Sequence, residues 1–162
     1  MKLCCMAKKE LFRNDPFSRK LIKSAGMVPV DRGGMNSSSM ENIKKRLKEN
    51  WGVIIHPEGT RSEDGVFRKI KNGASTLAIE TGAPIIPAYV DGAYNIFPKS
   101  GKMPKFYDWK HHKKFRLSVT FGKPISPDGL TTEELTAEIE RAISVLQDEN
   151  STLPQFQSHS AE

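Results

Sequence analysis

Short apolar runs alternate along this chain with segments of helical periodicity, and that alternation constrains the fold more than any other feature. The firmest helix begins at a capping box, Ser38-x-x-Glu41, and has apolar residues at helical spacing: Met40, Ile43, Leu47 and Trp51. Directly after it, residues 52–55 form a continuous apolar run, which is typical of a strand covered on both faces. The alternation predicts an α/β fold with a mostly parallel or mixed central sheet flanked by helices.

The other elements are predicted from the same signals. Strands are expected at 3–7, 27–30, 85–90 with an interruption at Pro87, and 115–121, where Phe115, Leu117, Val119 and Phe121 alternate with polar residues. Helices are expected from Asp15-Pro16 to Gly26, from Asn72 to Gly82, and from the capping box Thr131-x-x-Glu134 to Leu146. Residues 91–112 are expected to form a surface loop. We expect one domain over 1–148 and a flexible tail over 149–162.

Composition and charge limit the class of protein and the class of partner. The 162 residues are 37% hydrophobic and 27% charged, with a mean hydropathy of -0.50, which is typical of an ordinary globular domain. The formal net charge of +6 indicates anionic partners. The adjacent Cys4 and Cys5 are unsuited to a disulfide or a zinc site. No apolar run is long enough for a membrane-spanning helix, so contact with lipid is expected to be peripheral or to come from a missing segment.

Three predicted strands end in polar residues that suit a bound anion: Lys8-Lys9, Asp31-Arg32-Gly33 and Pro57 to Ser62. In open α/β sheets, ligands bind beyond the carboxyl ends of the strands. A guanidinium matches phosphate oxygens with a rigid fork of donors, and a lysine adds a second positive charge. A phosphate monoester is therefore the natural ligand. The alternative is a structural ion pair between Glu58 and Arg61 that closes the turn.

Five blocks of sequence follow one another along the chain: MAKKELF (6–12), GMVPVDRG (26–33), PEGTRS (57–62), IKNGASTLAIETGAPIIPAYVDG (70–92) and FGKPIS (121–126). In composition and order they resemble the glycerophospholipid acyltransferase family, and the bacterial lysophosphatidate acyltransferases in particular. The resemblance covers most of the chain. It implies a glycerolipid acyltransferase-like fold that is incomplete at its N-terminal end.

The resemblance also implies a reaction and a site. A fatty acyl group would pass from acyl carrier protein, coenzyme A or an acyl phosphate to the free hydroxyl of 1-acyl-glycerol-3-phosphate, which yields phosphatidic acid. No bound cofactor or metal is expected. The family's roles carry over to residues that bind the acceptor phosphate (Arg61, Lys8 and Arg32), residues that shape the acceptor site (Glu58, Gly59, Thr60 and Ser62), and residues on the acyl side (Ile85, Ile86 and Pro87).

The base of this reaction has no counterpart in the chain. The family uses a His-x4-Asp motif that lies upstream of its MAKKELF-like block, and here that block starts at Met6. The residues five positions after the candidate histidines are Arg61 after His56, Arg116 after His111 and Leu117 after His112. We therefore assign no catalytic residue, and expect His56 to be a packed or hydrogen-bonded histidine. The chain is expected to be a truncated acyltransferase or an inactive relative that binds phosphorylated lipid.

One further stretch, KFYDWKHHKKF at 105–115, interleaves aromatic and basic residues. It suits an anionic membrane surface, with Tyr107 and Trp109 at head-group depth and lysines facing lipid: Lys105, Lys110, Lys113 and Lys114. It also suits single-stranded nucleic acid, or a plain solvated loop. Because no nucleic-acid motif accompanies it, we expect no nucleic-acid partner. The expected location is peripheral, on the cytoplasmic side of an anionic membrane.

Overall fold

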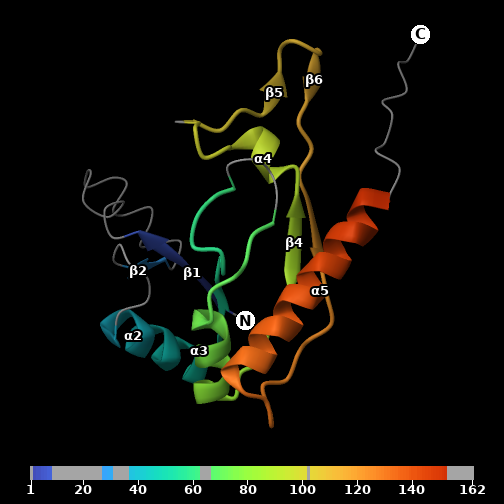
Figure 1. The fold of residues 1–162 in the computed structure, drawn as a ribbon. Coiled ribbons are helices and arrows are strands. Elements are labelled where there is room, and N and C mark those ends of the chain that lie inside the picture. The colour runs from blue at the N-terminus through green and yellow to red at the C-terminus, as the bar shows by residue number, and fades with distance from the viewer. Residues whose placement is uncertain (1, 9–26, 31–36, 63–66, 102, 153–162) are drawn as a thin grey trace. The chain divides into compact units, whose positions relative to one another are not determined.

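The computed structural model describes residues 2–8, 27–30, 37–62, 67–101 and 103–152, which fall into two compact units (Figure 1). The first unit comprises Met1–Thr60, Ile70–Pro84 and Ser126–Thr136. The second unit comprises Arg61–Lys69, Ile85–Ile125 and Ala137–Glu162. The division into a domain over 1–148 and a tail from 149 stays a prediction, although helix α5 continues to Thr152.

A three-stranded parallel sheet forms the first unit. Its order is β2 (Val28–Val30), β1 (Lys2–Lys8) and β3 (Trp51–Ile54). The register joins Lys8 to Val30 on one side of β1 and Cys5 to Ile54 on the other. Because all three strands run in the same direction, their carboxyl ends share one edge of the sheet. The predicted α/β class with parallel strands is confirmed, whereas the helix expected from Asp15 to Gly26 lies outside the described residues.

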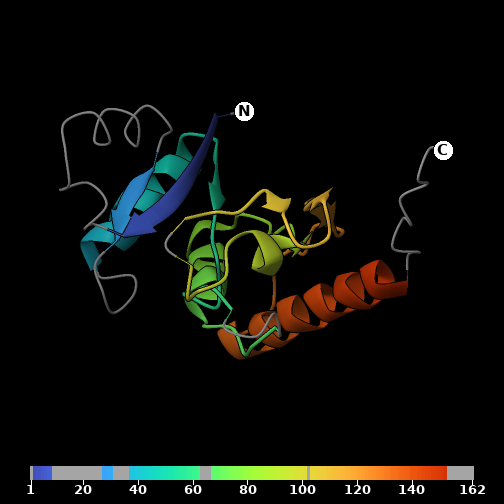
Figure 2. The same cartoon turned by 90° about the horizontal axis from the view of Figure 1, so that it is seen from above.

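Helix α2 (Ser37–Lys48) packs against β2, β3 and helix α3 (Gly73–Thr81), and Figure 2 shows it alongside the sheet. The centre of this core consists of Cys4, Ile43 and Leu77, each of them fully buried. Partly buried apolar residues surround these three: Met6, Met40, Leu47, Trp51, Val53 and Ile55. Each fully buried aliphatic side chain contributes about 1.5–3 kcal/mol to folding, so this cluster stabilises the first unit.

The sequence was misinterpreted at both ends of α2. The helix begins at Ser37, so Ser38 lies inside it, and the carboxylate of Glu41 binds the ammonium of Lys44 at 2.8 Å. Trp51 was expected on the helix but belongs to β3, because Asn50 adopts a left-handed conformation (φ 59°) that turns the chain out of the helix. Trp51 nevertheless packs on the same core.

Helix α3 begins and ends near the expected residues. Asn72 occupies the N-cap position without a side-chain capping hydrogen bond, and Gly82 ends the helix with a φ of 68°. Its buried Ser75 hydroxyl lies 2.7 Å from the hydroxyl of Thr136, at the start of helix α5 (Thr132–Thr152). The capping box predicted for that helix is confirmed, because Thr131 and Glu134 exchange side-chain and backbone hydrogen bonds.

The second unit is built on an antiparallel pair, β4 (Ala88–Asp91) with β7 (Ser118–Phe121). The predicted interruption at Pro87 is confirmed: Ile85 makes an isolated bridge to Ile125, and the Pro87 carbonyl accepts the Gly122 N–H at 2.8 Å. Helix α5 runs along this pair (Figure 1). Thr120 donates to the side chain of Asn150 at 3.0 Å, and the side chain of Tyr89 hydrogen-bonds Gln147; Asn150 and Gln147 both belong to α5.

The alternation over 115–121 predicted the strand but not the burial of its side chains. Leu117, Val119 and Phe121 are exposed, whereas Thr120 is half-buried. The register pairs Val90 with Val119 on one face and Tyr89 with Thr120 on the other. The hydrogen bonds to α5 come from the Tyr89 face, so the polar face is the one that the helix covers.

Residues 91–112 contain regular structure that the sequence analysis missed. They include the short helix α4 (Ala93–Ile96) and strand β5 (Tyr107–Asp108), which forms a hairpin with β6 (Lys113–Lys114). Gly92 leads into α4 with a φ of 79°, and a Cβ on it would lie 2.1 Å from the Arg116 carbonyl oxygen. Only glycine fits there, because a side chain would collide with backbone.

Candidate functional site

Two of the three polar strand ends can be located in the structure, and both lie at the carboxyl edge of the parallel sheet, as the sequence predicts. Lys8 lies three residues beyond Cys5, and Pro57 lies three residues beyond Ile54, the residue paired with Cys5. Both positions therefore follow the same edge. The structure describes the backbone of Lys8 and not its side chain, while Lys9 and Arg32 lie outside the described residues.

The loop after β3 is held by backbone hydrogen bonds. The Gly59 N–H donates to the His56 carbonyl at 3.0 Å, and the Lys71 N–H donates to the Pro57 carbonyl at 3.0 Å. Gly59 has a φ of 72°, and a Cβ on it would lie 3.3 Å from Lys71 Nζ. The turn therefore needs glycine for its conformation, whereas Lys71 Nζ is the end of a flexible, exposed side chain that can move aside. Of the two roles expected for His56, the packed one was wrong, because its side chain is exposed, while the hydrogen-bonded one stays a prediction.

Several contacts hold Arg61, one of the predicted site residues. Its Nη1 donates to the carbonyls of Pro98 at 2.8 Å and Gly101 at 3.4 Å, and its Nη2 donates to the carbonyl of Lys99 at 3.3 Å. The guanidinium also stacks 4.0 Å from the centre of the Phe97 ring. Carbonyls are uncharged, so these bonds set the plane of the guanidinium without cancelling its charge. The side chain as a whole remains exposed.

Each of the remaining predicted residues is described within its own unit. Glu58 and Thr60 belong to the first unit, half-buried and exposed respectively, and the half-buried Ser62 belongs to the second. The acyl-side residues also lie in the second unit, where Ile86 is exposed and Pro87 is buried. Ile85, between α3 and β4, is half-buried. The roles carried over for all of these residues stay predictions.

Two features of the site were missed from the sequence. Lys71 lies against Gly59 of the loop. It belongs to the block that begins IKNGAS, but no site role was predicted for it. Phe97 and the turn over 98–101 hold Arg61 from 36 to 40 residues further along the chain. The sequence Pro98-Lys99-Ser100-Gly101 is a recognisable turn signal, but nothing in the sequence indicates which side chain such a turn would bind.

Neither a thiol nucleophile nor a metal site is evident in the described parts of the chain. Cys4 and Cys5 are free cysteines, and burial raises the pKa of both thiols, so both are protonated near neutral pH and poorly nucleophilic. Across the described residues, no group of three His, Cys, Asp or Glu side chains is placed to hold a metal ion. Across the same residues, no helix is long and apolar enough to cross a membrane.

Comparison with known proteins gives consistent matches. The family model described as Acyltransferase matches residues 1–91. A 1-acyl-sn-glycerol-3-phosphate acyltransferase of Bacillus subtilis is 37% identical over 120 residues, which are 74% of this chain and 53% of that protein. One of Borreliella burgdorferi is 32% identical over 97 residues, 59% of this chain and 38% of that protein. The chain thus spans about half or less of the length of these relatives.

A solved structure shows the same fold. It is the crystal structure of the 1-acyl-sn-glycerophosphate (LPA) acyltransferase PlsC of Thermotoga maritima, which matches with a TM-score of 0.69. The match covers 92% of this chain and 57% of that one, at 24% sequence identity. It confirms the α/β architecture that the sequence predicted.

Proposed function

Because this chain belongs to the acyltransferase family, we propose that it takes part in the transfer of a fatty acyl group to the free hydroxyl of 1-acyl-glycerol-3-phosphate. The product is phosphatidic acid, a precursor of phospholipids. The relatives from Bacillus subtilis and Borreliella burgdorferi support the proposal, since both are 1-acyl-sn-glycerol-3-phosphate acyltransferases. Within this reaction, the chain binds the phosphate of the acceptor.

The observation that carries the proposal is the fixed guanidinium of Arg61. An arginine side chain loses rotational freedom when it binds a ligand, and that loss weakens binding. Here three carbonyls and the Phe97 ring orient the guanidinium before any ligand arrives. A preoriented, exposed cation in the PEGTRS block suits the doubly charged phosphate monoester of the acceptor better than it suits a neutral lipid.

The chemistry requires one group beyond this site. The acceptor oxygen forms an ester bond with the acyl carbon, the bond from that carbon to sulfur or to phosphate oxygen breaks, and a base takes the hydroxyl proton. No histidine of the 162 residues is followed by Asp at the family spacing. We therefore assign acceptor binding to this chain and assign none of its residues the role of base.

The donor and the location complete the proposal. The acyl group comes from acyl carrier protein, coenzyme A or an acyl phosphate, each of which is a co-substrate and not a bound cofactor. The acceptor has one fatty acyl chain and resides in lipid bilayers. The proposed place of action is therefore the surface of an anionic membrane, on its cytoplasmic side.

Binding of a water-soluble, short-chain lysophosphatidate tests the acceptor site, because this measurement does not need the base. Arg61→Ala should weaken binding about 10- to 150-fold, the range for a lost charge-assisted hydrogen bond. Arg61→Lys should fall between the wild type and Arg61→Ala, since lysine keeps the charge and loses the fork. Arg141→Ala, which removes an exposed arginine of α5, is the matched control and should bind normally. Equal binding by Arg61→Ala and the wild type would refute the acceptor site.

A second candidate function is phosphorylated-lipid binding without catalysis, which needs only the oriented guanidinium of Arg61 and no base. The two candidates separate when the His-x4-Asp segment of an active family member is fused ahead of Met1. Acyl transfer by the fusion, abolished by Arg61→Ala, supports the acyltransferase. A folded fusion that binds lysophosphatidate and transfers no acyl group from any of the three donors supports a binding protein.

A further inference from the structure

The positive charge of this protein is concentrated in one short segment. Residues 99–116 contain a single acid, Asp108, and seven basic residues: Lys99, Lys102, Lys105, Lys110, Lys113, Lys114 and Arg116. Their net charge of +6 equals the formal net charge of the whole chain, so the remaining residues are balanced. A partner attracted by this protein's charge is therefore attracted mainly to this segment.

The structure folds much of the segment into a fixed hairpin. Strands β5 and β6 pair Tyr107 with Lys114 and Asp108 with Lys113. At its base, the Phe115 N–H donates to the Phe106 carbonyl at 3.0 Å, and the Lys105 N–H donates to the Ile96 carbonyl of α4 at 2.7 Å. Figure 1 shows the hairpin extending beyond α4 at one end of the second unit. Its basic side chains are thus presented from a defined backbone.

The single acid of the segment is used within the turn. Asp108 Oδ1 accepts the N–H groups of Lys110 and His111 at 3.0 and 3.3 Å, and Oδ2 lies 2.7 Å from His111 Nδ1. These bonds lower the pKa of Asp108, the His111 side chain contributing most. Its carboxylate stabilises the turn, while the side chains of Lys110, Lys113 and Lys114 are exposed.

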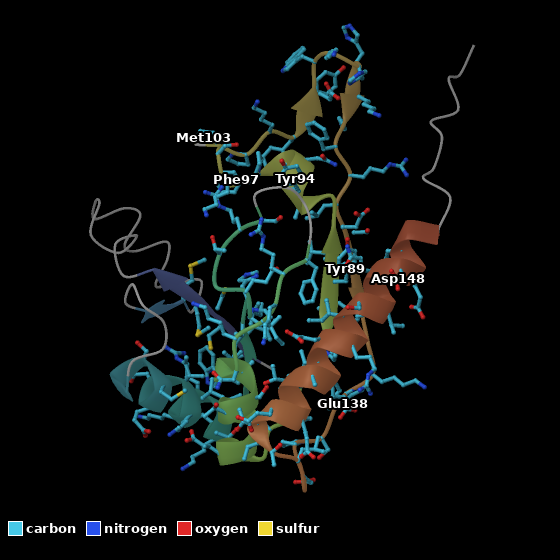
Figure 3. The ribbon with its side chains drawn as sticks, viewed as in Figure 1. Tyr89, Tyr94, Phe97, Met103, Glu138 and Asp148 are labelled. Atoms are coloured by element: carbon cyan, nitrogen blue, oxygen red, sulfur yellow. The ribbon has the colours of Figure 1, made fainter. Side chains whose placement is uncertain are left out.

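Large apolar side chains lie exposed among these cations. Met103 is 74% exposed, Phe106 is 68% exposed and Trp109 is 79% exposed. The Trp109 ring packs edge-on against Tyr107, with ring centres 4.7 Å apart, so it is held in a defined position. Tyr94 and Phe97 are also partly exposed, and Figure 3 labels both, with Met103, at the end of the unit that carries the hairpin. Such a group of exposed apolar residues marks an interaction surface.

We propose that the hairpin surface, residues 103–116, binds the surface of an anionic lipid bilayer. Trp109, Phe106 and Met103 enter the head-group region, and the lysines contact lipid phosphates. Binding of the bilayer follows from the hairpin itself. Only the purpose of this binding, which is to bring the acceptor site to a lipid acceptor, rests on the proposed function.

The same observations favour a bilayer over the two other anionic partners. Single-stranded nucleic acid needs flat aromatic faces for its bases, whereas Trp109 and Tyr107 are inclined at 62° to each other and Met103 has no ring. An acidic protein such as an acyl carrier protein would match the lysines but not three apolar side chains this exposed. A bilayer interface accommodates both kinds of group.

The first test is sedimentation of the full chain with vesicles of phosphatidylcholine and phosphatidylglycerol. Lys113→Gln with Lys114→Gln should weaken partitioning about tenfold or more, because both lysines contribute to the attraction between the hairpin and the anionic surface, and by similar amounts. Trp109→Ser should also weaken it. The matched control, Lys45→Gln with Lys48→Gln, removes the same charge from exposed positions of α2 and should bind like the wild type. Equal loss in both double variants, or no loss in either, overturns the proposal.

The second test uses the protein's own fluorescence. The chain has two tryptophans, so Trp51→Phe leaves Trp109 as the single reporter. Its emission should shift to shorter wavelength on anionic vesicles, and brominated lipids should quench it. An unchanged spectrum overturns the proposal. Binding of single-stranded DNA or of acyl carrier protein without binding of vesicles overturns it as well, and assigns the surface to that partner.

The two proposals fail separately. The vesicles contain no lysophosphatidate, so Arg61→Ala should bind them like the wild type. The hairpin variants should in turn bind short-chain lysophosphatidate like the wild type. Loss of vesicle binding in Arg61→Ala would show that the two surfaces are one, and would overturn the hairpin as an independent contact.

Discussion

The guanidinium of Arg61 lies 4.0 Å from the centre of the Phe97 ring, and the backbone turn that follows Phe97 binds the same guanidinium through three carbonyls. A ring face and a set of carbonyl oxygens both attract a cation without neutralising it. The second unit thus holds the arginine of the PEGTRS loop in one orientation. Phe97 is a positioning residue for this cation in the proposed acceptor site.

Phe97→Ala should weaken binding of short-chain lysophosphatidate about two- to fivefold, because an exposed cation–π contact contributes about 0.5–1 kcal/mol. Phe97→Tyr keeps the ring face and should restore binding, which a loss of folding would not allow. Calorimetric titration of both variants measures the effect. Wild-type affinity in Phe97→Ala would show that the carbonyls alone position the guanidinium.

Gly92→Ala should destabilise the protein severely. The left-handed backbone costs about 1–2 kcal/mol for any residue with a Cβ, and the clash with the Arg116 carbonyl typically adds about 1–3 kcal/mol. Gly82→Ala is the control, since Gly82 has a φ of 68° and nothing within 4 Å of the added Cβ, so it should show the conformational cost alone. Urea unfolding compares the two, and equal losses would contradict the clash.

The capping box of α5 should make stability depend on pH in the acid range. Hydrogen bonds from the Thr131 N–H and hydroxyl lower the pKa of Glu134 below its ordinary value. A carboxyl with a lowered folded-state pKa stabilises the protein above its unfolded-state pKa, near about 4, and this contribution is lost as the pH falls through the folded-state value. The stability difference between the wild type and Glu134→Gln should therefore shrink on acidification. A difference that grows would refute the assignment.

Ser75→Ala should cost about 0.5–1.5 kcal/mol of stability. The Thr136 hydroxyl donates to the Thr132 carbonyl at 2.7 Å, so its one proton is used, and Ser75 must be the donor in the 2.7 Å contact between the two hydroxyls. Alanine removes this buried donor and leaves the Thr136 oxygen without it. Ser75→Thr would add a methyl group at a fully buried position and should destabilise the protein more than Ser75→Ala does. A neutral Ser75→Ala in thermal unfolding would show that the bond contributes nothing.

Local signals predicted the elements well where the backbone alone decides them. Gly82 ended α3, Pro87 interrupted the strand before β4, and Thr131 with Glu134 capped α5, each by a mechanism complete within a few residues. The prediction failed where one residue could reach the core from either of two elements. Trp51 has the spacing expected of a residue in α2, but a residue in β3 can pack on the same core. The left-handed turn at Asn50 ends the helix and places Trp51 in β3.

The sequence by itself determined the α/β class, the described strands and helices on either side of residues 91–114, and the polar residues that follow the strands, because hydrophobic period and turn chemistry are local. It also determined the concentration of positive charge at 99–116, since charge follows composition. Tertiary structure alone decided that Lys71 lies against Gly59 and that Phe97 and its turn hold Arg61. Those contacts join residues 12 to 40 positions apart, and their geometry is set by the packing of whole elements rather than by any local preference.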